Sequence, residues 1–95
     1  MAKKSCRRTV THVMDGDTFE VARRIGKFNI IRLANVNAPS KNTKAGMKAM
    51  QVLRGMIGGK VVTIRPVGTS YNRIVAEVFA DRKSVNKRMR ERGYR

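Results

Sequence analysis

The sequence predicts a small barrel of five short β-strands, with one helix between the third and fourth strands and a short helix near the C-terminal end. Three observations lead to this fold class. β-favouring residues recur in short runs before residue 37 and between residues 60 and 80. Residues 45–57 have helical periodicity instead. The 95 residues suffice for one domain but not for two. This order of elements is that of the OB-fold, an all-β or α+β barrel.

The first part of the chain is typical of a meander of three antiparallel strands. Turn residues separate the runs, first at Asp15-Gly16-Asp17 and then in a hairpin loop at residues 24–27. The third run ends at Asn37-Ala38-Pro39, because proline cannot donate a hydrogen bond to a neighbouring strand. The predicted strands cover residues 8–14, 18–24 and 28–36.

The second part of the chain combines helical and strand patterns. Between Ala45 and Ile57 the apolar residues fall at i, i+4, i+7 and i+8, and Gly58-Gly59 ends the helix. Ser84 is a suitable N-cap for a last helix that runs to about Glu91. The two strands predicted between these helices cover residues 60–67 and 71–80.

The N-terminal residues predict an arm rather than part of the barrel. We expect residues 1–7 to form a basic, flexible arm and residues 8–95 to form a single domain. No apolar segment follows the first basic residues, so we expect neither a signal peptide nor a membrane span, and a cytoplasmic location. Cys6 is the only cysteine, which excludes an intramolecular disulfide. We expect a monomer.

Net charge is the clearest signal in the composition. The chain has 22 Lys and Arg against six Asp and Glu, a formal net charge of +16. Such an excess attracts polyanions, and nucleic acid is the partner it favours. An anionic membrane would require a long amphipathic helix, which the sequence lacks. With only three Phe and two Tyr, base stacking is limited, so we expect salt-sensitive binding to the DNA or RNA backbone.

Five short motifs occur in an informative order along the chain. Together they resemble the staphylococcal nuclease (thermonuclease) family, over about residues 8–94. The resemblance implies an OB-fold barrel that acts on the phosphodiester bonds of nucleic acid. The motifs are Asp15-Gly16-Asp17-Thr18, Ile31-Arg32-Leu33, Val36-Asn37-Ala38-Pro39, Tyr71-Asn72-Arg73 and Ser84-Val85-Asn86.

The resemblance assigns phosphate binding to three residues. Arg32 and Arg73 match the two arginines that hold the phosphate and assist catalysis in the family. Guanidinium groups suit this role, because they bind phosphate through two parallel hydrogen bonds and stay charged at any working pH. Tyr71 matches a tyrosine that bonds the terminal phosphate, although a tyrosine at the barrel rim would explain it equally well.

The same resemblance implies a metal site that this sequence has altered. Asp17 matches an aspartate that binds Ca²⁺, and the backbone carbonyl of Ala38 matches a further ligand. Asn37 replaces the second carboxylate ligand, so calcium should bind weakly or not at all. Ser40 stands where the family has the catalytic glutamate, and a serine cannot act as a general base near neutral pH without a base of its own.

Structural or surface roles explain two other polar residues better than catalysis does. The resemblance implies that Asn86 is buried and structural. His12, the only histidine, lies in a strand on a face that we expect to be exposed, where surface residues are commoner than catalysts.

Three functions stay open on these grounds. The chain is a nuclease-like protein that binds nucleic acid with weak or lost phosphodiesterase activity, an active calcium-dependent endonuclease, or an architectural protein that coats DNA or RNA by charge. The substitutions at Asn37 and Ser40 favour the first, since loss of a positioned base alone typically costs about 10²–10⁴-fold in rate.

Overall fold

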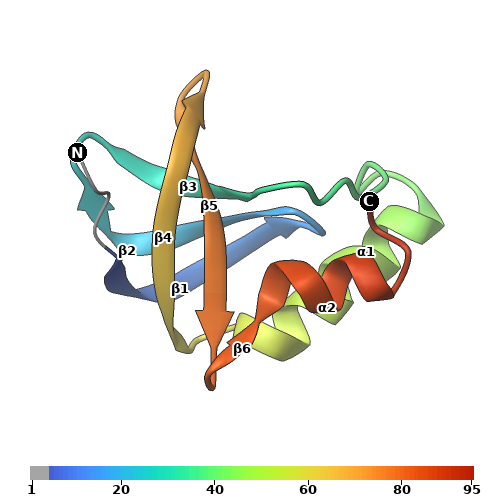
Figure 1. Ribbon diagram of the computed structural model, residues 1–95. Coiled ribbons are helices and arrows are strands. Elements are labelled where there is room, and N and C mark those ends of the chain that lie inside the picture. Colours follow the sequence, from blue (N-terminus) through green and yellow to red (C-terminus); the bar gives the residue numbers. More distant parts are fainter. Residues whose placement is uncertain (1–4) are drawn as a thin grey trace.

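The computed structural model describes residues 5–95 and confirms the predicted barrel, with an additional short strand (Figure 1). The elements in chain order are β1 (Cys6–Asp15), β2 (Thr18–Ile25), β3 (Phe28–Leu33), α1 (Lys44–Ile57), β4 (Val61–Ser70), β5 (Arg73–Ala80), β6 (Lys83–Ser84) and α2 (Val85–Glu91). Neither helix is long and apolar enough within the described residues to cross a membrane.

The strands form one sheet that closes on itself. The order is β3-β2-β1-β4-β5-β6, and β3 also pairs with β5 in parallel, which closes the barrel. β1, β2 and β3 form the predicted antiparallel meander. In Figure 1 both helices lie on the same side of the strands.

The first strand begins earlier than expected. β1 begins at Cys6, so Cys6 and Arg7 pair with Ile64 and Thr63 of β4 instead of belonging to the predicted arm. Residues 1–4 of that arm lie outside the described residues. The thiol of Cys6 is free, as expected for a single cysteine.

The third strand is shorter than predicted. β3 ends at Leu33, not at residue 36, because Asn35 adopts a positive φ of 57° that no extended strand allows. Ser84 caps α2 as predicted, because its Oγ accepts a hydrogen bond of 3.1 Å from the amide of Lys87. Lys83–Ser84 also form the short strand β6 against the end of β5. The early end of β3 matters for the site, because it releases the following loop from the sheet.

The core lies inside the barrel and under α1. Its largest fully buried side chains include Phe19, Ile31, Leu33, Leu53, Ile57, Ile64 and Met89, which come from both helices and three strands. The predicted apolar stripe of α1 therefore faces the barrel. Thr43 caps this helix by accepting a hydrogen bond of 3.0 Å from the amide of Gly46.

Asn86 is structural, as the resemblance implied. It is fully buried, and its Oδ1 accepts from the amide of Val78 at 2.9 Å. Its Nδ2 donates to the carbonyls of Ala34 and Ala76, both at 3.0 Å. These bonds join the start of α2 to β5 and to the segment after β3.

Two close approaches hold the loops against α1. A Cβ atom on Gly16 would lie 2.6 Å from the Cβ atoms of both Ala38 and Ala49. A Cβ atom on Gly46 would collide with the carbonyl of Ser40. The turn between β1 and β2 and the loop after β3 therefore meet on the N-terminal half of α1.

Candidate phosphate-binding site

The site forms where the turn at residues 15–17 meets the loop after β3. Oδ2 of Asp17 accepts a hydrogen bond of 3.0 Å from the amide of Ala38. The carbonyl of Asp17 accepts from the amide of Leu33 at 2.8 Å. Oδ1 accepts from the hydroxyl of Thr18 at 2.8 Å. These contacts bring the first three motifs of the sequence together.

Arg32 is anchored on one side of this junction. Its Nη1 donates to the carbonyls of Leu33 and Val36 at 2.8 and 2.9 Å, and its Nη2 donates to Oδ1 of Asn37 at 2.8 Å. Nη2 also lies 3.6 Å from Oδ2 of Asp17 in an ion pair, and the Arg32 side chain is 24% exposed. Of its five N–H donors, two have no hydrogen-bond partner within the described residues. The half-buried guanidinium is therefore fixed by three hydrogen bonds, and two of its N–H groups remain available to a ligand.

Arg73 lies on the same outer face of the barrel as Arg32. In the parallel pair of β3 and β5, Ile31 is opposite Ile74 and Arg32 is opposite Val75. Ile31 and Ile74 are both buried, so Arg32 and Arg73, each one position away from them, point outward. Arg73 is exposed at the first position of β5. The two predicted arginines are therefore near neighbours on one surface.

Tyr71 was predicted to begin the fifth strand, but it lies in the turn before Arg73. It is 94% exposed and has a positive φ of 57°. It borders a hollow of about 340 Å³ between this turn and the hairpin that joins β2 to β3. Sequence analysis assigned no site role to the other residues that line it, which are Arg24, Lys27, Phe28, Asn29, Ile30 and Asn72.

The turn holds two carboxyl groups, and their pKa values shift in opposite directions. Burial raises the pKa of Asp15, and the adjacent Asp17 carboxyl adds to this rise. Burial also acts against the charged form of Asp17, but hydrogen bonds with Asp15, the Ala38 amide and Thr18, together with the charge of Arg32, lower its pKa below 3.8. Asp17 is therefore the carboxyl of the pair whose charged form the fold favours. Asp15 accepts from the amide of Asp17 at 3.1 Å and supports it.

The metal ligands that the resemblance implied include a single carboxylate, that of Asp17. Ca²⁺ takes six to eight oxygen ligands and prefers several carboxylates. Both carboxylate oxygens of Asp17 already accept hydrogen bonds, and the side-chain oxygen of Asn37 faces the Arg32 guanidinium. Within residues 5–95 there is no group of three or more His, Cys, Asp or Glu side chains that could hold a metal ion.

Ser40 lies in the loop but has a structural task. Its Oγ accepts a hydrogen bond of 3.3 Å from the amide of Asn42, and its carbonyl accepts from the hydroxyl of Thr43 at 2.7 Å. Ser40 thus shapes the loop that leads into α1. Glu77 is the acidic residue of β5, and its carboxylate is engaged away from this loop. Its Oε2 accepts a hydrogen bond of 3.0 Å from Nδ2 of Asn86.

Comparisons with known proteins find similar sequences. Residues 30–95 match the family described as "Staphylococcal nuclease homologue". A protein of Escherichia coli named "Uncharacterized endonuclease" is 36% identical over 84 residues, which cover 84% of this chain and 53% of that protein. A protein of Haemophilus influenzae with the same name is 30% identical over 92 residues, which cover 96% of this chain and 51% of that protein. The chain spans about half the length of these curated relatives.

Proposed function

This chain belongs to the family of staphylococcal nuclease homologues, and from that membership we propose that it binds the phosphate backbone of DNA or RNA and hydrolyses it weakly or not at all. Arg32 and Arg73 hold the phosphate, and the loop from Asn37 to Ser40 lacks the groups that would activate water. The observation that carries the proposal is the state of this loop. Its two polar side chains hold Arg32 and a backbone amide, and neither of them is a carboxylate.

Binding by Arg32 rests on its fixed orientation. The carbonyls of Leu33 and Val36 hold Nη1, so little side-chain entropy remains to be lost when a phosphate binds the free donors. The ion pair with Asp17 keeps the guanidinium on the barrel surface without saturating it. Arg73 supplies a second, exposed charge on the same face, and together the two make a phosphate grip.

The surroundings of this grip suit a nucleic acid chain. Tyr71 and Phe28 border the hollow beside Arg73, and Arg24 and Lys27 line the same hollow. The amine of Lys27 lies 5.5 Å from the centre of the Phe28 ring. Aromatic faces next to cations are the elements that bind unpaired bases and their phosphates. We therefore propose that a single-stranded segment follows this side of the barrel.

Hydrolysis would require two further groups. One must orient or deprotonate the attacking water, and another must stabilise the charge that develops on the phosphorane oxygens. Arg32 and Arg73 supply the second. Ser40 cannot supply the first, because its hydroxyl has no basic partner among the described residues and its oxygen accepts from Asn42. The phosphate therefore binds without an activated water.

Two alternative functions have specific support. The two relatives named endonuclease favour an active nuclease, which would require a different arrangement of the Asn37 loop. The net charge of +16 favours an architectural protein that coats nucleic acid through its whole surface and leaves the grip unused.

A binding assay with matched charge variants separates these functions. We expect a labelled single-stranded oligonucleotide to bind with an affinity that falls steeply between low and moderate salt. Arg73→Gln should weaken binding about tenfold, as expected for loss of a charged hydrogen bond. Arg23→Gln removes the same charge from an exposed residue of β2 and should have a smaller effect. Equal effects of the two variants would favour the coating protein.

A cleavage assay addresses the remaining alternative. The protein with Ca²⁺ or Mg²⁺ should leave the oligonucleotide nearly intact over hours. Rapid cleavage that disappears in Arg73→Gln would establish the active nuclease and refute the weak or absent activity proposed here.

A further inference from the structure

A hollow on the outer face of the barrel lies where β1, β4 and the end of β5 meet. Its volume is about 450 Å³, within the range of small-ligand pockets, about 300–1,000 Å³. It is lined by Arg7, Val61, Thr63, Phe79, Asp81 and Arg82. We propose that an unpaired base of single-stranded nucleic acid stacks on Phe79 in this hollow, while Arg7 and Arg82 bind the adjoining phosphates; the inference rests on the proposed function.

The strand register places Arg7 and Phe79 in one row across three strands. Thr63 of β4 is paired with Arg7 of β1 on one side and with Phe79 of β5 on the other. The residues that precede Thr63 and Phe79 are buried, so this row faces outward, and Arg7 is exposed. Neighbouring strands are about 4.8 Å apart, which puts the backbones of Arg7 and Phe79 about 10 Å apart. The Arg7 side chain can therefore reach a phosphate attached to a base that lies on Phe79.

The Phe79 ring already lies next to one cation. Cζ of Arg65 is 5.9 Å from the centre of the ring. Arg65 does not line the hollow, so the hollow borders a different part of the ring. Phe79 is only partly buried. A base can therefore stack on the ring while Arg65 stays against it, and an aromatic ring beside arginine is the arrangement that binds unpaired bases of any sequence.

The turn beside the hollow holds an arginine against its backbone preference. Asp81 and Arg82 form the turn between the paired residues Ala80 and Lys83, and their φ angles are 52° and 67°. Glycine is favoured at the second position of such a turn, because a side chain at positive φ clashes with the backbone. Strained backbone of this kind is commonest at binding sites. The turn thus places a cation beside Phe79 at a cost in conformational strain.

The carboxylate in the lining does not neutralise the two arginines. Oδ2 of Asp81 lies 3.1 Å from Nζ of Lys60, in an ion pair. The other ion pair within residues 5–95 joins Arg32 to Asp17 at the grip. The charges of Arg7 and Arg82 therefore remain available to an anion from outside the protein, and phosphate suits their guanidinium groups.

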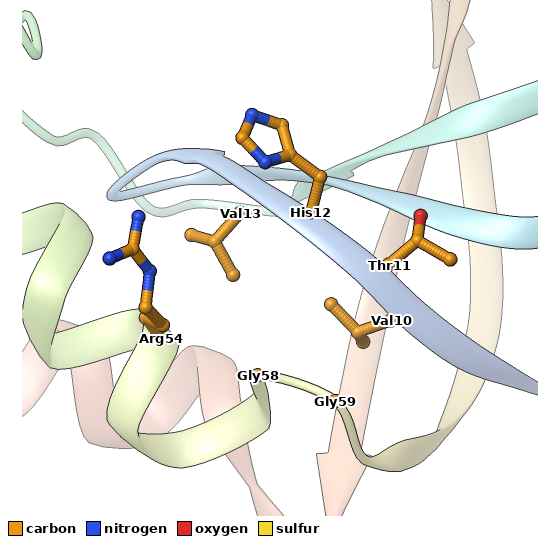
Figure 2. A pocket seen from close by; sticks show the side chains of 7 residues that line it. All are labelled: Val10, Thr11, His12, Val13, Arg54, Gly58 and Gly59. Atoms are coloured by element: carbon orange, nitrogen blue, oxygen red, sulfur yellow. The ribbon is translucent and has the colours of Figure 1, made fainter.

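The hollow between β1 and the C-terminal end of α1 does not offer this combination. Its volume is about 390 Å³, and Figure 2 shows the residues that line it. Val10 and Val13 point toward the helix, whereas the His12 ring is directed away from the helix and from Arg54. These two nitrogen-bearing side chains do not converge, and no Phe or Tyr ring lines the hollow. We therefore assign it no ligand.

The hollow at Phe79 and the grip lie toward opposite ends of β5. Arg73 is the first residue of this strand, and the strand rises about 20 Å from Arg73 to Phe79. In Figure 1 the end of β5 beside β6 lies opposite the turn that joins β4 to β5. A single strand of several nucleotides can contact both places, in line with the binding lengths of OB barrels, about 4–16 nucleotides.

Binding of a labelled single-stranded oligonucleotide at several salt concentrations tests the stacked base. Phe79→Leu should weaken binding at least about fivefold at every salt concentration, because the lost contact is uncharged. Phe79→Tyr keeps the ring and should bind like the wild type. Val67→Ala changes an exposed apolar residue of β4 outside the hollow and should also bind like the wild type.

Arg82→Gly tests the phosphate contact in a variant that should fold at least as well as the wild type. Glycine removes the strain at positive φ, so the Tm should equal or exceed that of the wild type. Binding should weaken about fivefold, and the slope of log affinity against log salt should fall by about one. Arg23→Gln removes the same charge outside this hollow and should have a smaller effect.

Unchanged binding by Phe79→Leu would overturn the proposal, and so would a loss in Arg82→Gly no larger than that in Arg23→Gln. A poly-glutamate peptide is the rival ligand. If it binds as tightly as the oligonucleotide and Phe79→Leu weakens both equally, the partner is an acidic protein and the nucleic acid ligand is refuted.

The outcomes also separate this inference from the proposed function. If Arg73→Gln impairs oligonucleotide binding, and neither Phe79→Leu nor Arg82→Gly does, the grip stands and the hollow at Phe79 fails. If Phe79→Leu and Arg82→Gly impair binding and Arg73→Gln does not, the hollow stands and the grip fails. A wild type that binds no oligonucleotide would refute both.

Discussion

Nη2 of Arg32 donates a hydrogen bond of 2.8 Å to Oδ1 of Asn37. This hydrogen bond directs the side-chain oxygen of Asn37 toward the arginine. The resemblance matches Asn37 to a position that holds a carboxylate in the family. An aspartate at this position would bring a negative charge to the same corner as Asp17. In this chain the corner is held by an arginine and an amide, which stabilises the loop without creating a cation site.

The first prediction concerns the restoration of catalysis. Asn37→Asp together with Ser40→Glu should increase Ca²⁺-dependent cleavage of single-stranded DNA at least about 100-fold over the wild type, because a positioned base contributes about 10²–10⁴-fold. The measurement is the initial rate of oligonucleotide cleavage on a denaturing gel. The pair restores both carboxylates that the loop lacks, on a scaffold that already positions Arg32.

The appropriate control adds Arg73→Gln to the double variant. Activity gained at the intended site should then disappear, whereas a contaminating nuclease would be unaffected. Wild-type activity equal to that of the double variant would show that Ser40 and Asn37 do not limit the chemistry.

The sequence alone predicted the barrel, because strand alternation and helical periodicity are local patterns. The alternation put Ile31 and Leu33 on one face of the third strand and Arg32 on the other, and the structure buries Ile31 and Leu33. The parallel pairing that sets Arg32 opposite Val75 joins strands 43 residues apart in the chain. No local pattern indicates such a contact.

The details of the loop were also beyond sequence analysis. A residue's identity does not reveal that the side chain of Ser40 accepts from Asn42 or that β3 ends at Leu33. These features follow from the left-handed backbone of Asn35 and from the packing of the loop on α1.

The second prediction concerns pH and the two carboxyl groups of the turn. The folded state lowers the pKa of Asp17 below 3.8, so its carboxylate stabilises the fold above that pH, and the contribution is lost as the pH falls through the lowered value. Asp17→Asn should therefore reduce stability at pH 7 by about 1–3 kcal/mol, the range for hydrogen bonds of charged groups. Urea unfolding at several pH values should show this deficit shrinking below pH 3.8.

Asp15→Asn is the matched variant with the opposite sign. The folded state raises the pKa of Asp15 above 3.8, so its protonated form is favoured and the charged form opposes folding at neutral pH. The amide retains an acceptor for the Asp17 N–H. Stability at pH 7 should be unchanged or increased, and any gain should vanish below pH 3.8. A loss of stability equal to that of Asp17→Asn would contradict the opposite pKa shifts of the two carboxyl groups.

The third prediction compares two glycines of α1. Gly55→Ala should stabilise the protein by about 0.5–1 kcal/mol, since alanine favours a helix and no atom lies within 4 Å of the new Cβ. Gly46→Ala should destabilise it, because the new Cβ meets the carbonyl of Ser40. Thermal unfolding measures both, and a Tm that rises in both variants would show that the loop yields without cost.

The fourth prediction concerns the buried amide that joins α2 to the barrel. Asn86→Ala leaves the Val78 amide and the carbonyls of Ala34 and Ala76 without this partner. Since each buried unpaired group costs about 1–3 kcal/mol, we expect a total loss of about 3 kcal/mol or more. Asn42→Ala changes an exposed side chain whose backbone amide keeps its bond to Ser40, so its effect should stay within about 0.5 kcal/mol. Similar losses in the two variants would mean that the Asn86 bonds do not stabilise the fold. A large loss in Asn86→Ala alone would identify this amide as the connection that keeps β5, and with it Arg73, in register with β3.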